Sequence, residues 1–597
     1  MRHVIKARFF VIGGLTLLFL ACTSTTPTPT TAPAPPTVAA PASTPVPAAT
    51  ATATVPAPAP TTVPEATPAP EPTATPLPTP VPTPAPAPPN GKSGGSLTVG
   101  SFADIPHRDV HQAVQEALTS LGPGLAYSRL LRLRSDPNLD QPNLLLECDL
   151  CQSWRLTTDF AYEFQLRPDV RWQNISPVDG RALVADDLVF SYERLRTPGW
   201  PNASLFTSIG EIEATGPHTL RVNLASADAD ALLSLADGHS KIVAREVVEQ
   251  YQDLRDGPVI GTGAWLWEGT ETGIGTTLGR NPDYFESGLP FLDELAIKVI
   301  KPLGAGRSAD RERLAAFQGG MVDVVLLPPP EWQKLQAAGT DIGSVLTKQA
   351  GTGVMFAINV QTPVFSRLEV RHAVFRAMDP WDYVDTLWSG QGFVSLGIPV
   401  QGPQWLLGRA EMRNDYFGDP GVAREMLAAS GLSAPVDVEL TVRTQESGDI
   451  YLELEQSVVN DLRAVGFNPR IRRLNPAQFS ETVFDYKDYQ VALGVLPPTS
   501  TSNSFLLALL HSSGRWNIAG HEDELLDGMI ERQAAEFDPD RRGTQLQDIQ
   551  RHVLEQAYLF SPITGTSRWV FKPGLKGFHP NTTLSEYNYW SRAWLDR

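Results

Sequence analysis

Two cysteines separated by two residues, Cys148 and Cys151, are the first candidates for chemistry in this sequence. In an oxidising compartment this spacing favours a local disulfide. A redox-active pair and an inert reduced pair are the alternatives, but the expected strand–helix–strand setting of a redox motif is missing. A zinc site would need two more ligands, and the chain has no second cysteine pair. We therefore expect a disulfide and no metal site.

No group of residues has the pattern of a catalytic centre. The Gly-x-Ser-x-Gly, P-loop and His-Glu-x-x-His patterns are absent from the sequence. His521-Glu522 lacks the second histidine of the last pattern. Asp186 and Asp187 are adjacent, so on a helix their side chains diverge and cannot share a substrate. We expect a binding protein without a cofactor rather than an enzyme.

The segment 162–195 contains a strand, a turn and a helix in succession. Residues 162–166 alternate apolar and polar side chains, as a half-buried strand does. A Pro/Asp/Gly turn follows at 177–180. The helix carries Asp186 and Asp187 in its first turn, where carboxylates favour the positive helix end. Val184 stands before this helix, so a side-chain N-cap is not expected.

Three later helices are predicted to begin at Asp-Pro pairs. Aspartate is a good N-cap, and proline suits the first helical position. We expect structural roles for these aspartates, which are Asp379, Asp419 and Asp538. Gly431 fits the left-handed position after the second of these helices.

Taken together and in order, these segments resemble the motifs of the bacterial extracellular solute-binding proteins of family 5, the dipeptide- and oligopeptide-binding components of ABC importers. No single motif is decisive, but the ordered set is specific. The resemblance covers approximately residues 97–597. The matching segments are 162–195, 261–265 with 280–285, 317–323, 359 with 370–379, 419–431, and 516–526 with the helix after Asp538.

The resemblance implies an α/β, bilobal periplasmic-binding-protein-like fold (type II, family 5) with an extra inserted subdomain. The first lobe is expected at about 97–130, 255–355 and 566–597. The inserted subdomain is expected at about 131–254, and the second lobe at about 356–565. The ligand would lie between the lobes and be enclosed by hinge closure.

The first 96 residues have a different character. Basic residues, a short apolar run at 9–20 and then Cys22 resemble a lipoprotein signal peptide at 1–21. An uncleaved anchor and ordinary secretion with a free cysteine are the alternatives. Residues 22–96, mostly Thr, Pro and Ala, lack the apolar surface needed to fold, so we expect a disordered linker. Lipidated Cys22 would hold the protein at the extracytoplasmic face of the cell membrane.

Charge and hydropathy restrict the partners. The net charge of −18 argues against nucleic-acid binding and against anionic lipid as a partner of the folded part. No later apolar run is long enough for a transmembrane helix, so the membrane is contacted through the lipid only. Transport would need separate ABC permease and ATPase subunits, and we expect a monomer. The alternative functions are binding of a non-peptide solute, such as an oligosaccharide or a metal chelate, and a sensor or scavenger role.

The usual amine anchor of the family is missing. Peptide-binding members hold the ligand's amino group with an Asp just after the strand aligned here with residues 490–494. That position falls near Pro498, and no acidic residue occurs between Asp488 and Glu522. An ammonium enclosed without a carboxylate loses hydration at a considerable cost in free energy. We therefore expect weak or no binding of free dipeptides, unless Asp104 supplies the carboxylate; a turn or capping role is its alternative.

Further ligand contacts are predicted from positions in the family pattern. A core role is the alternative for Tyr127, and a loop-pinning role is the alternative for Trp405. The full set of predicted ligand-binding residues is Phe102, Asp104, Tyr127, Trp405, Gly494, Val495, Trp516 and Asn517.

Overall fold

The computed structural model describes residues 91–597, except 102, 159–160, 302–308, 445–448, 498, 582, 584 and 597. The chain divides into two units, Met1–Thr75 and Pro76–Arg597, and all described residues belong to the second unit. The predicted signal peptide, the lipidation site Cys22 and nearly all of the predicted linker lie outside the described residues, as does Phe102.

The central element is a mixed 11-stranded sheet, in which ten strands follow one path and β13 (Phe393–Ser395) pairs with β17 beside it. The strands along the path are β15 (Phe467–Leu474), β14 (Val436–Arg443), β16 (Val491–Val495), β12 (Gly343–Ile358), β17 (Leu559–Phe571), β11 (Val324–Leu327), β1 (Ser96–Ser101), β10 (Glu294–Val299), β9 (Gly275–Arg280) and β8 (Trp265–Glu271).

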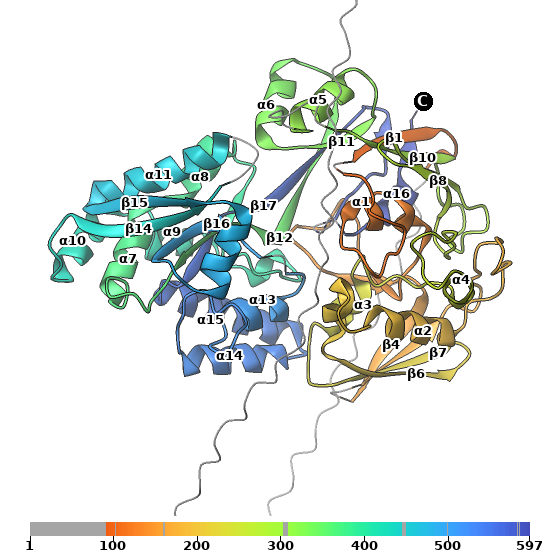
Figure 1. The fold of residues 1–597 in the computed structure, drawn as a ribbon, viewed down its shortest axis with the longest axis horizontal. Helices are drawn as coiled ribbons and strands as arrows, with labels where there is room; N and C mark the ends of the chain where they lie inside the picture. Colours follow the sequence, from red (N-terminus) through yellow and green to blue (C-terminus); the bar gives the residue numbers. More distant parts are fainter. Residues whose placement is uncertain are drawn as a thin grey trace, which may run out of the picture. The chain divides into compact units, whose positions relative to one another are not determined.

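Two long antiparallel strands, β12 and β17, connect the two halves of this path (Figure 1). The start of β12 pairs with the end of β17 beside β11, as in Gly343 opposite Phe571. Their other ends pair beside β16, as in Phe356 opposite Phe560. We call the half containing β11, β1, β10, β9 and β8 the first lobe. The half containing β16, β14 and β15 is the second lobe.

A four-stranded antiparallel sheet forms the inserted subdomain, in the order β4 (Cys151–Thr158), β5 (Ala161–Leu166), β7 (Thr219–Leu224) and β6 (Ile209–Gly216). Helix α2 (Ala185–Leu195) packs on β6. The predicted strand and helix of the segment 162–195 are therefore confirmed. Without a side-chain cap at Val184, the carboxylate of Asp187 accepts the Val184 N–H at 3.0 Å and pairs with Arg181 at 2.7 Å.

The helices of the second lobe begin where the Asp-Pro pairs predict. Asp379, Asp419 and Asp538 each accept hydrogen bonds from two backbone N–H groups of the following turn. Gly431 has φ 73°, the left-handed conformation expected after the helix that Asp419 begins. The helices in this lobe are α7 (Leu368–Ala377), α8 (Pro380–Leu387), α9 (Arg409–Tyr416), α10 (Pro420–Ala429), α11 (Asp449–Val465), α12 (Pro476–Phe479), α13 (Ser502–Leu509), α14 (Glu524–Ala534) and α15 (Pro539–Glu555).

The remaining elements are short. The helices are α1 (Glu116–Thr119), α3 (Ala231–Ala236), α4 (Arg245–Tyr251), α5 (Ala309–Gln318), α6 (Pro329–Ala337) and α16 (Tyr589–Arg592). Two-stranded sheets are formed by β2 (Leu131–Leu133) with β3 (Leu146–Cys148), and by β18 (Leu575–Lys576) with β19 (Trp594–Leu595). Among the described helices, none combines the length and the apolar character needed to cross a membrane. The residue boundaries expected for the lobes and the subdomain remain predictions.

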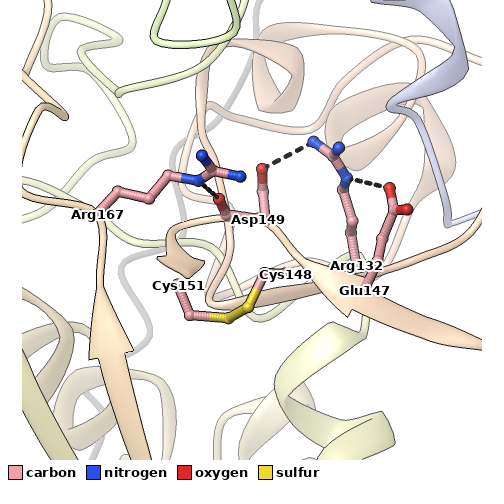
Figure 2. The surroundings of a disulfide bond; sticks show 6 residues. All are labelled: Arg132, Glu147, Cys148, Asp149, Cys151 and Arg167. Atoms are coloured by element: carbon pink, nitrogen blue, oxygen red, sulfur yellow. Dashed lines mark hydrogen bonds and ion pairs between the residues drawn. A yellow bond between two sulfur atoms is a disulfide. The ribbon is translucent and has the colours of Figure 1, made fainter. Parts of the chain in front are cut away.

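Cys148 and Cys151 are joined by a disulfide at the bend between β3 and β4 (Figure 2). Asp149 lies inside this bend. Its carboxylate accepts hydrogen bonds from the Arg132 guanidinium at 3.2 Å and from the Arg129 N–H at 2.9 Å. Arg167 donates to the Asp149 carbonyl at 2.8 Å, as Figure 2 also shows. The disulfide therefore closes a short loop that places a buried carboxylate among arginines.

Replacing both cysteines, as Cys148→Ser with Cys151→Ser, is expected to lower the free energy of unfolding by about 2 kcal/mol. This is the loop-closure entropy of so short a cross-link. Guanidinium unfolding of the wild type and the double variant measures the difference. Adding a reductant should shift the wild type toward the variant and leave the variant unchanged. Equal stabilities would show that the cross-link does not constrain the unfolded chain.

Candidate functional site

A cavity of about 340 Å³ lies where β11 and β17 meet the helices of the first lobe. This volume falls at the lower end of the range of small-molecule sites, which is roughly 300–1,000 Å³. We call it the β11–β17 cavity. It is lined by Glu116, Asp310, Arg313, Leu326, Leu327, Pro328, Thr566, Ser567 and Arg568. Apolar side chains with a few polar or charged groups are the usual composition of a ligand site.

Arg568 provides a cation in the wall of this cavity. It lies on β17, in register with Leu327 of β11 and Leu346 of β12. Its guanidinium donates to Gln391 Oε1 at 3.2 Å and to Ser344 Oγ at 3.4 Å, and it lies 4.7 Å from the centre of the Trp332 ring. Burial lowers the pKa of this guanidinium, which nevertheless stays charged.

The partners of the Arg568 guanidinium are neutral. Within the part of the chain that the structure describes, no carboxylate pairs with it. A half-buried guanidinium has five N–H donors in a planar fork, which suits a carboxylate held by two parallel hydrogen bonds. Arg568 can therefore hold an anionic group of a ligand.

Glu116 provides a carboxylate in the same cavity. It is the first residue of the short helix α1 and is partly buried. For the residues described, no hydrogen bond or ion pair of its side chain is found. Burial raises the pKa of the Glu116 carboxyl to about 7, and the nearby His239 acts in the opposite direction. A cation placed beside this group would stabilise its ionised form.

The remaining charged side chains of the lining belong to one ion pair. Asp310 and Arg313 are paired three residues apart on α5. Arg313 also donates to the Leu326 carbonyl at 3.3 Å, which ties α5 to the end of β11. This pair stabilises the wall of the cavity. In the described residues, no group of three or more His, Cys, Asp or Glu side chains could hold a metal ion.

The predicted contact Tyr127 lies in a different place. It is 1% exposed and lines a second cavity of about 10 Å³, with Arg129, Trp265 and Tyr587 among its neighbours. A space of this size holds about one water molecule. The Tyr127 carbonyl also accepts the Tyr587 hydroxyl at 2.9 Å. This placement favours the alternative core role of Tyr127.

Asp104 is already engaged within the first lobe. Its carboxylate accepts the Gly273 N–H of the β8–β9 turn at 2.6 Å and pairs with Lys301 at 3.2 Å. These contacts correspond to the structural alternative for Asp104. Its role as an amine anchor remains a prediction.

Trp405 lies in the core of the second lobe, where it is 3% exposed. Its ring packs on α15, so that a Cβ added at Gly543 would approach the indole to 2.7 Å. The Arg542 guanidinium lies 5.6 Å from the ring, and Gln550 donates to the Trp405 carbonyl at 2.7 Å. The loop-pinning role is the one that this environment favours.

Gly494 and Val495 form the end of β16 and pair with Met355 and Val354 of β12. A Cβ at Gly494 would approach the Phe479 ring to 2.4 Å, so the glycine allows this phenylalanine to pack on the strand. Pro498, at the position of the missing anchor, lies outside the described residues.

Trp516 and Asn517 stabilise the loop that follows α13. The Asn517 side chain donates to the Ser512 carbonyl at 2.9 Å and to the His521 carbonyl at 2.8 Å. Trp516 packs against Phe484, with 5.8 Å between ring centres. Of the predicted ligand contacts that the structure describes, none lines the β11–β17 cavity.

The sequence contains a weak signal for one of the two cavity residues that the predictions missed. Arg568 is the single charged residue in the strand Leu559–Phe571, which is otherwise apolar or neutral. A lone charge on a long central strand indicates a special environment. Glu116 had no comparable signal, because its helix has only four residues and no clear periodicity.

Asp228 and Asp230 of the inserted subdomain contact residues of the second lobe. The carboxylate of Asp230 pairs with Arg542 at 2.6 Å and accepts the Asn503 N–H at 2.8 Å. Asp228 accepts the Asn503 side-chain amide at 2.5 Å. We call these four residues the subdomain–lobe contact. Its ion pair is almost fully enclosed, because each side chain is 2% exposed.

Comparison with known protein families gives one match that covers most of the chain. Residues 146–517 match the family described as bacterial extracellular solute-binding proteins, family 5 Middle.

Two curated relatives have low but extended similarity. Heme-binding protein A of Haemophilus influenzae is 23% identical over 465 residues, which cover 72% of this chain and 81% of the relative. The probable di/tripeptide-binding protein 5 of Pseudomonas aeruginosa is 24% identical over 515 residues, which cover 81% of this chain and 93% of the relative.

Among solved structures, the ABC transporter substrate-binding protein CtaP of Listeria monocytogenes has a similar fold. The TM-score is 0.71 at 17% sequence identity, and the match covers 85% of this chain and 100% of the other. At this identity the likeness concerns the fold, which confirms the predicted α/β, bilobal architecture.

Proposed function

Because the chain belongs to family 5 of the bacterial extracellular solute-binding proteins, we propose that it captures a peptide or peptide-like solute in the β11–β17 cavity and delivers it to an ABC importer. The observation that carries this proposal is the guanidinium of Arg568, which lines the cavity with neutral partners only among the described residues.

Membership of the family has direct consequences. The protein is a solute-binding protein of an ABC transporter and not an enzyme, and it acts outside the cytoplasm. The predicted binding function is in this respect confirmed. The net charge of −18 also fits a protein whose partners are a solute and transporter subunits rather than nucleic acid.

A carboxylate-bearing ligand suits the cavity best. The Arg568 fork can form two parallel hydrogen bonds with a carboxylate. The end of β11 adds apolar surface from Leu326, Leu327 and Pro328. A short peptide offers both a terminal carboxylate and apolar side chains. The Pseudomonas aeruginosa relative, whose name describes a di/tripeptide-binding protein, supports the same ligand class.

A ligand screen tests this proposal. Thermal-shift measurements and native mass spectrometry would compare short peptides with oligosaccharides, nickel chelates and heme. Peptides are expected to raise the melting temperature by mass action, and the scattering radius should decrease as the lobes close. Stabilisation by an oligosaccharide, a chelate or heme alone would favour the non-peptide alternative. Turnover of a bound solute would contradict a binding role.

Coupling to import is a separate part of the proposal. A sensor or scavenger would bind the same solute without passing it to a permease. Uptake of the labelled solute by cells with and without the protein separates these roles. Loss of uptake in cells lacking the protein is expected. Unchanged uptake, with binding retained in vitro, would favour the sensor or scavenger role.

Replacing Cys22 by serine is expected to release the protein from membranes into the soluble fraction. We propose that acyl chains on Cys22 anchor the protein, because the cysteine follows directly on an apolar signal-like segment. Cell fractionation followed by mass spectrometry of the mature N-terminus measures both the release and the lipid. An unmodified N-terminus at another residue would contradict the anchor.

A further inference from the structure

The β11–β17 cavity contains a carboxyl group and a guanidinium that form no ion pair among the described residues. Glu116 and Arg568 both line it. The other charged residues of the lining, Asp310 and Arg313, already pair with each other. When the cleft closes, a carboxylate and a guanidinium inside it lose their hydration. This loss costs free energy unless the ligand places an opposite charge beside each group.

Both charges belong to the first-lobe side of the molecule. Arg568 lies on the part of β17 that pairs with β11. Glu116 lies in the segment after β1, and a nearby Trp590 side chain ties this segment to α16 by donating to the Ser120 carbonyl at 3.3 Å. The family's usual amine anchor would instead lie after β16 in the second lobe, where this chain has proline.

We propose that Glu116 and Arg568 are the two charged anchors of the ligand, and that the ligand carries a protonated nitrogen at Glu116 and a carboxylate at Arg568. A short unblocked peptide or an amino-acid derivative has this chemistry. This inference rests on the proposed function and adds that one lobe recognises both charged ends before the second lobe closes. It also changes the expectation for free peptides, because Glu116 replaces the missing carboxylate and Asp104 is already paired with Lys301.

The protonation of Glu116 gives the inference a second readout. Its carboxyl has a pKa of about 7 because it is buried. The ionisable groups around it are His239, Tyr589 and the cavity residues Asp310, Arg313 and Arg568. An ammonium beside Glu116 lowers the pKa of the carboxyl, so binding near neutral pH releases a proton.

The ionisation of Glu116 determines how ligand affinity depends on pH. Affinity rises as the pH increases through about 7, because Glu116 becomes ionised. It falls again when the ligand's α-amino group loses its proton above pH ~8. A ligand held only through its carboxylate would lack the first of these two steps.

The experiment uses the full-length protein and calorimetric titration with di-, tri- and tetraalanine. Each peptide is compared with its N-acetylated and its C-amidated form. Blocking either end is expected to weaken binding by about a hundredfold, as is typical for the loss of one partner of an enclosed charge pair. Glu116→Gln should remove the effect of N-acetylation, and Arg568→Gln should remove the effect of C-amidation.

Proton release separates an anchoring role of Glu116 from a merely structural one. Titrations in buffers of different ionisation enthalpy measure the protons released on binding at pH 6.5–7. Release is expected for the wild type and is expected to disappear in Glu116→Gln. Glu163→Gln and Arg155→Gln remove the two charges of an exposed ion pair on the inserted subdomain and serve as matched controls. Both controls are expected to bind as the wild type does.

Three results would overturn the inference. The first is equal binding of free and blocked peptides by the wild type, which decides the question even if a variant does not fold. The second is loss of the amine preference in Asp104→Asn with its retention in Glu116→Gln. The third is stabilisation by another solute of the wider screen with no response to alanine peptides. The proposed function fails separately, if no peptide or peptide-like solute of the wider screen binds or if a bound solute is turned over.

Discussion

Replacing Asp230 by alanine is expected to weaken ligand binding by about a hundredfold. The substitution breaks an ion pair with Arg542 in which each side chain is 2% exposed. Removing one partner of a buried pair leaves an uncompensated charge and costs about 3–5 kcal/mol. About 1.4 kcal/mol corresponds to a tenfold change in affinity, so even the lower figure gives this effect.

We expect the cost to fall on the arrangement in which the inserted subdomain contacts the second lobe, rather than on folding of either part. The two hydrogen-bond partners of the Asp230 carboxylate, Asn503 and Arg542, both belong to the second lobe. The backbone supports the same contact, since Ala229 N–H donates to the Ala534 carbonyl at 2.8 Å. Hinge opening would separate these groups and expose them to water. Water would then solvate each charge, so the loss of one partner would cost little.

Affinity for the solute identified by the screen and the scattering radius of the ligand-free protein measure this effect. We expect a larger radius in Asp230→Ala than in the wild type. Asp437→Ala is the matched control, because Asp437 pairs with Arg470 at 2.7 Å on an exposed surface of the second lobe. Such exposed pairs contribute roughly 0–1 kcal/mol. Equal affinity and equal radius in both variants would show that the subdomain–lobe contact does not stabilise closure.

The double variant Asp230→Ala with Arg542→Met supplies a further check. Without the arginine no unpaired charge remains enclosed, so part of the lost affinity should return. A double variant as weak as the sum of its single variants would contradict direct coupling between the two residues.

Local patterns predicted the elements of this fold well. The N-caps at Asp379, Asp419 and Asp538 are formed as the Asp-Pro pairs indicate. These features depend on neighbouring residues alone, because each carboxylate accepts hydrogen bonds from backbone N–H groups two and three residues further along the chain. The ordered motifs then identified the family, and with it the bilobal architecture, which periodicity could not establish.

The site was predicted less well, because it depends on contacts between distant segments. Trp405 stands in a Pro/Gly-rich loop that suggests exposure, yet Gly543 on α15 gives its ring space to pack in the core. Asn517 has the polarity of a ligand contact, but the carbonyls of its own loop use its amide. Glu116 and Arg568 meet at one cavity only because the sheet brings the end of the chain back beside β11.

A buried network of charges gives the last prediction, which concerns acid stability. Glu286 pairs with Arg132, whose side chain is fully buried, and with Arg592 of α16 at 3.1 Å. Arg132 also pairs with Glu147 at 2.7 Å. The network connects the β2–β3 sheet, the loop before β10 and the C-terminal segment. Its free energy therefore affects the stability of the first lobe as a whole.

Lowering the pH is expected to remove about 3 kcal/mol of stability through Glu286 alone. Burial by itself raises the pKa of this carboxyl, but Arg132 and then Arg592 outweigh burial and lower the pKa from 4.5 to about 2. A carboxyl with a lowered folded-state pKa stabilises the protein above its unfolded-state pKa. That contribution is lost as the pH falls through the window from about 4.5 to about 2. Guanidinium unfolding between pH 2 and pH 6 measures the slope, which should be shallower in Glu286→Gln. Glu163→Gln, on the exposed sheet of the inserted subdomain, should keep the wild-type slope. The same slope in wild type and Glu286→Gln would show that the network does not hold Glu286 in its ionised form.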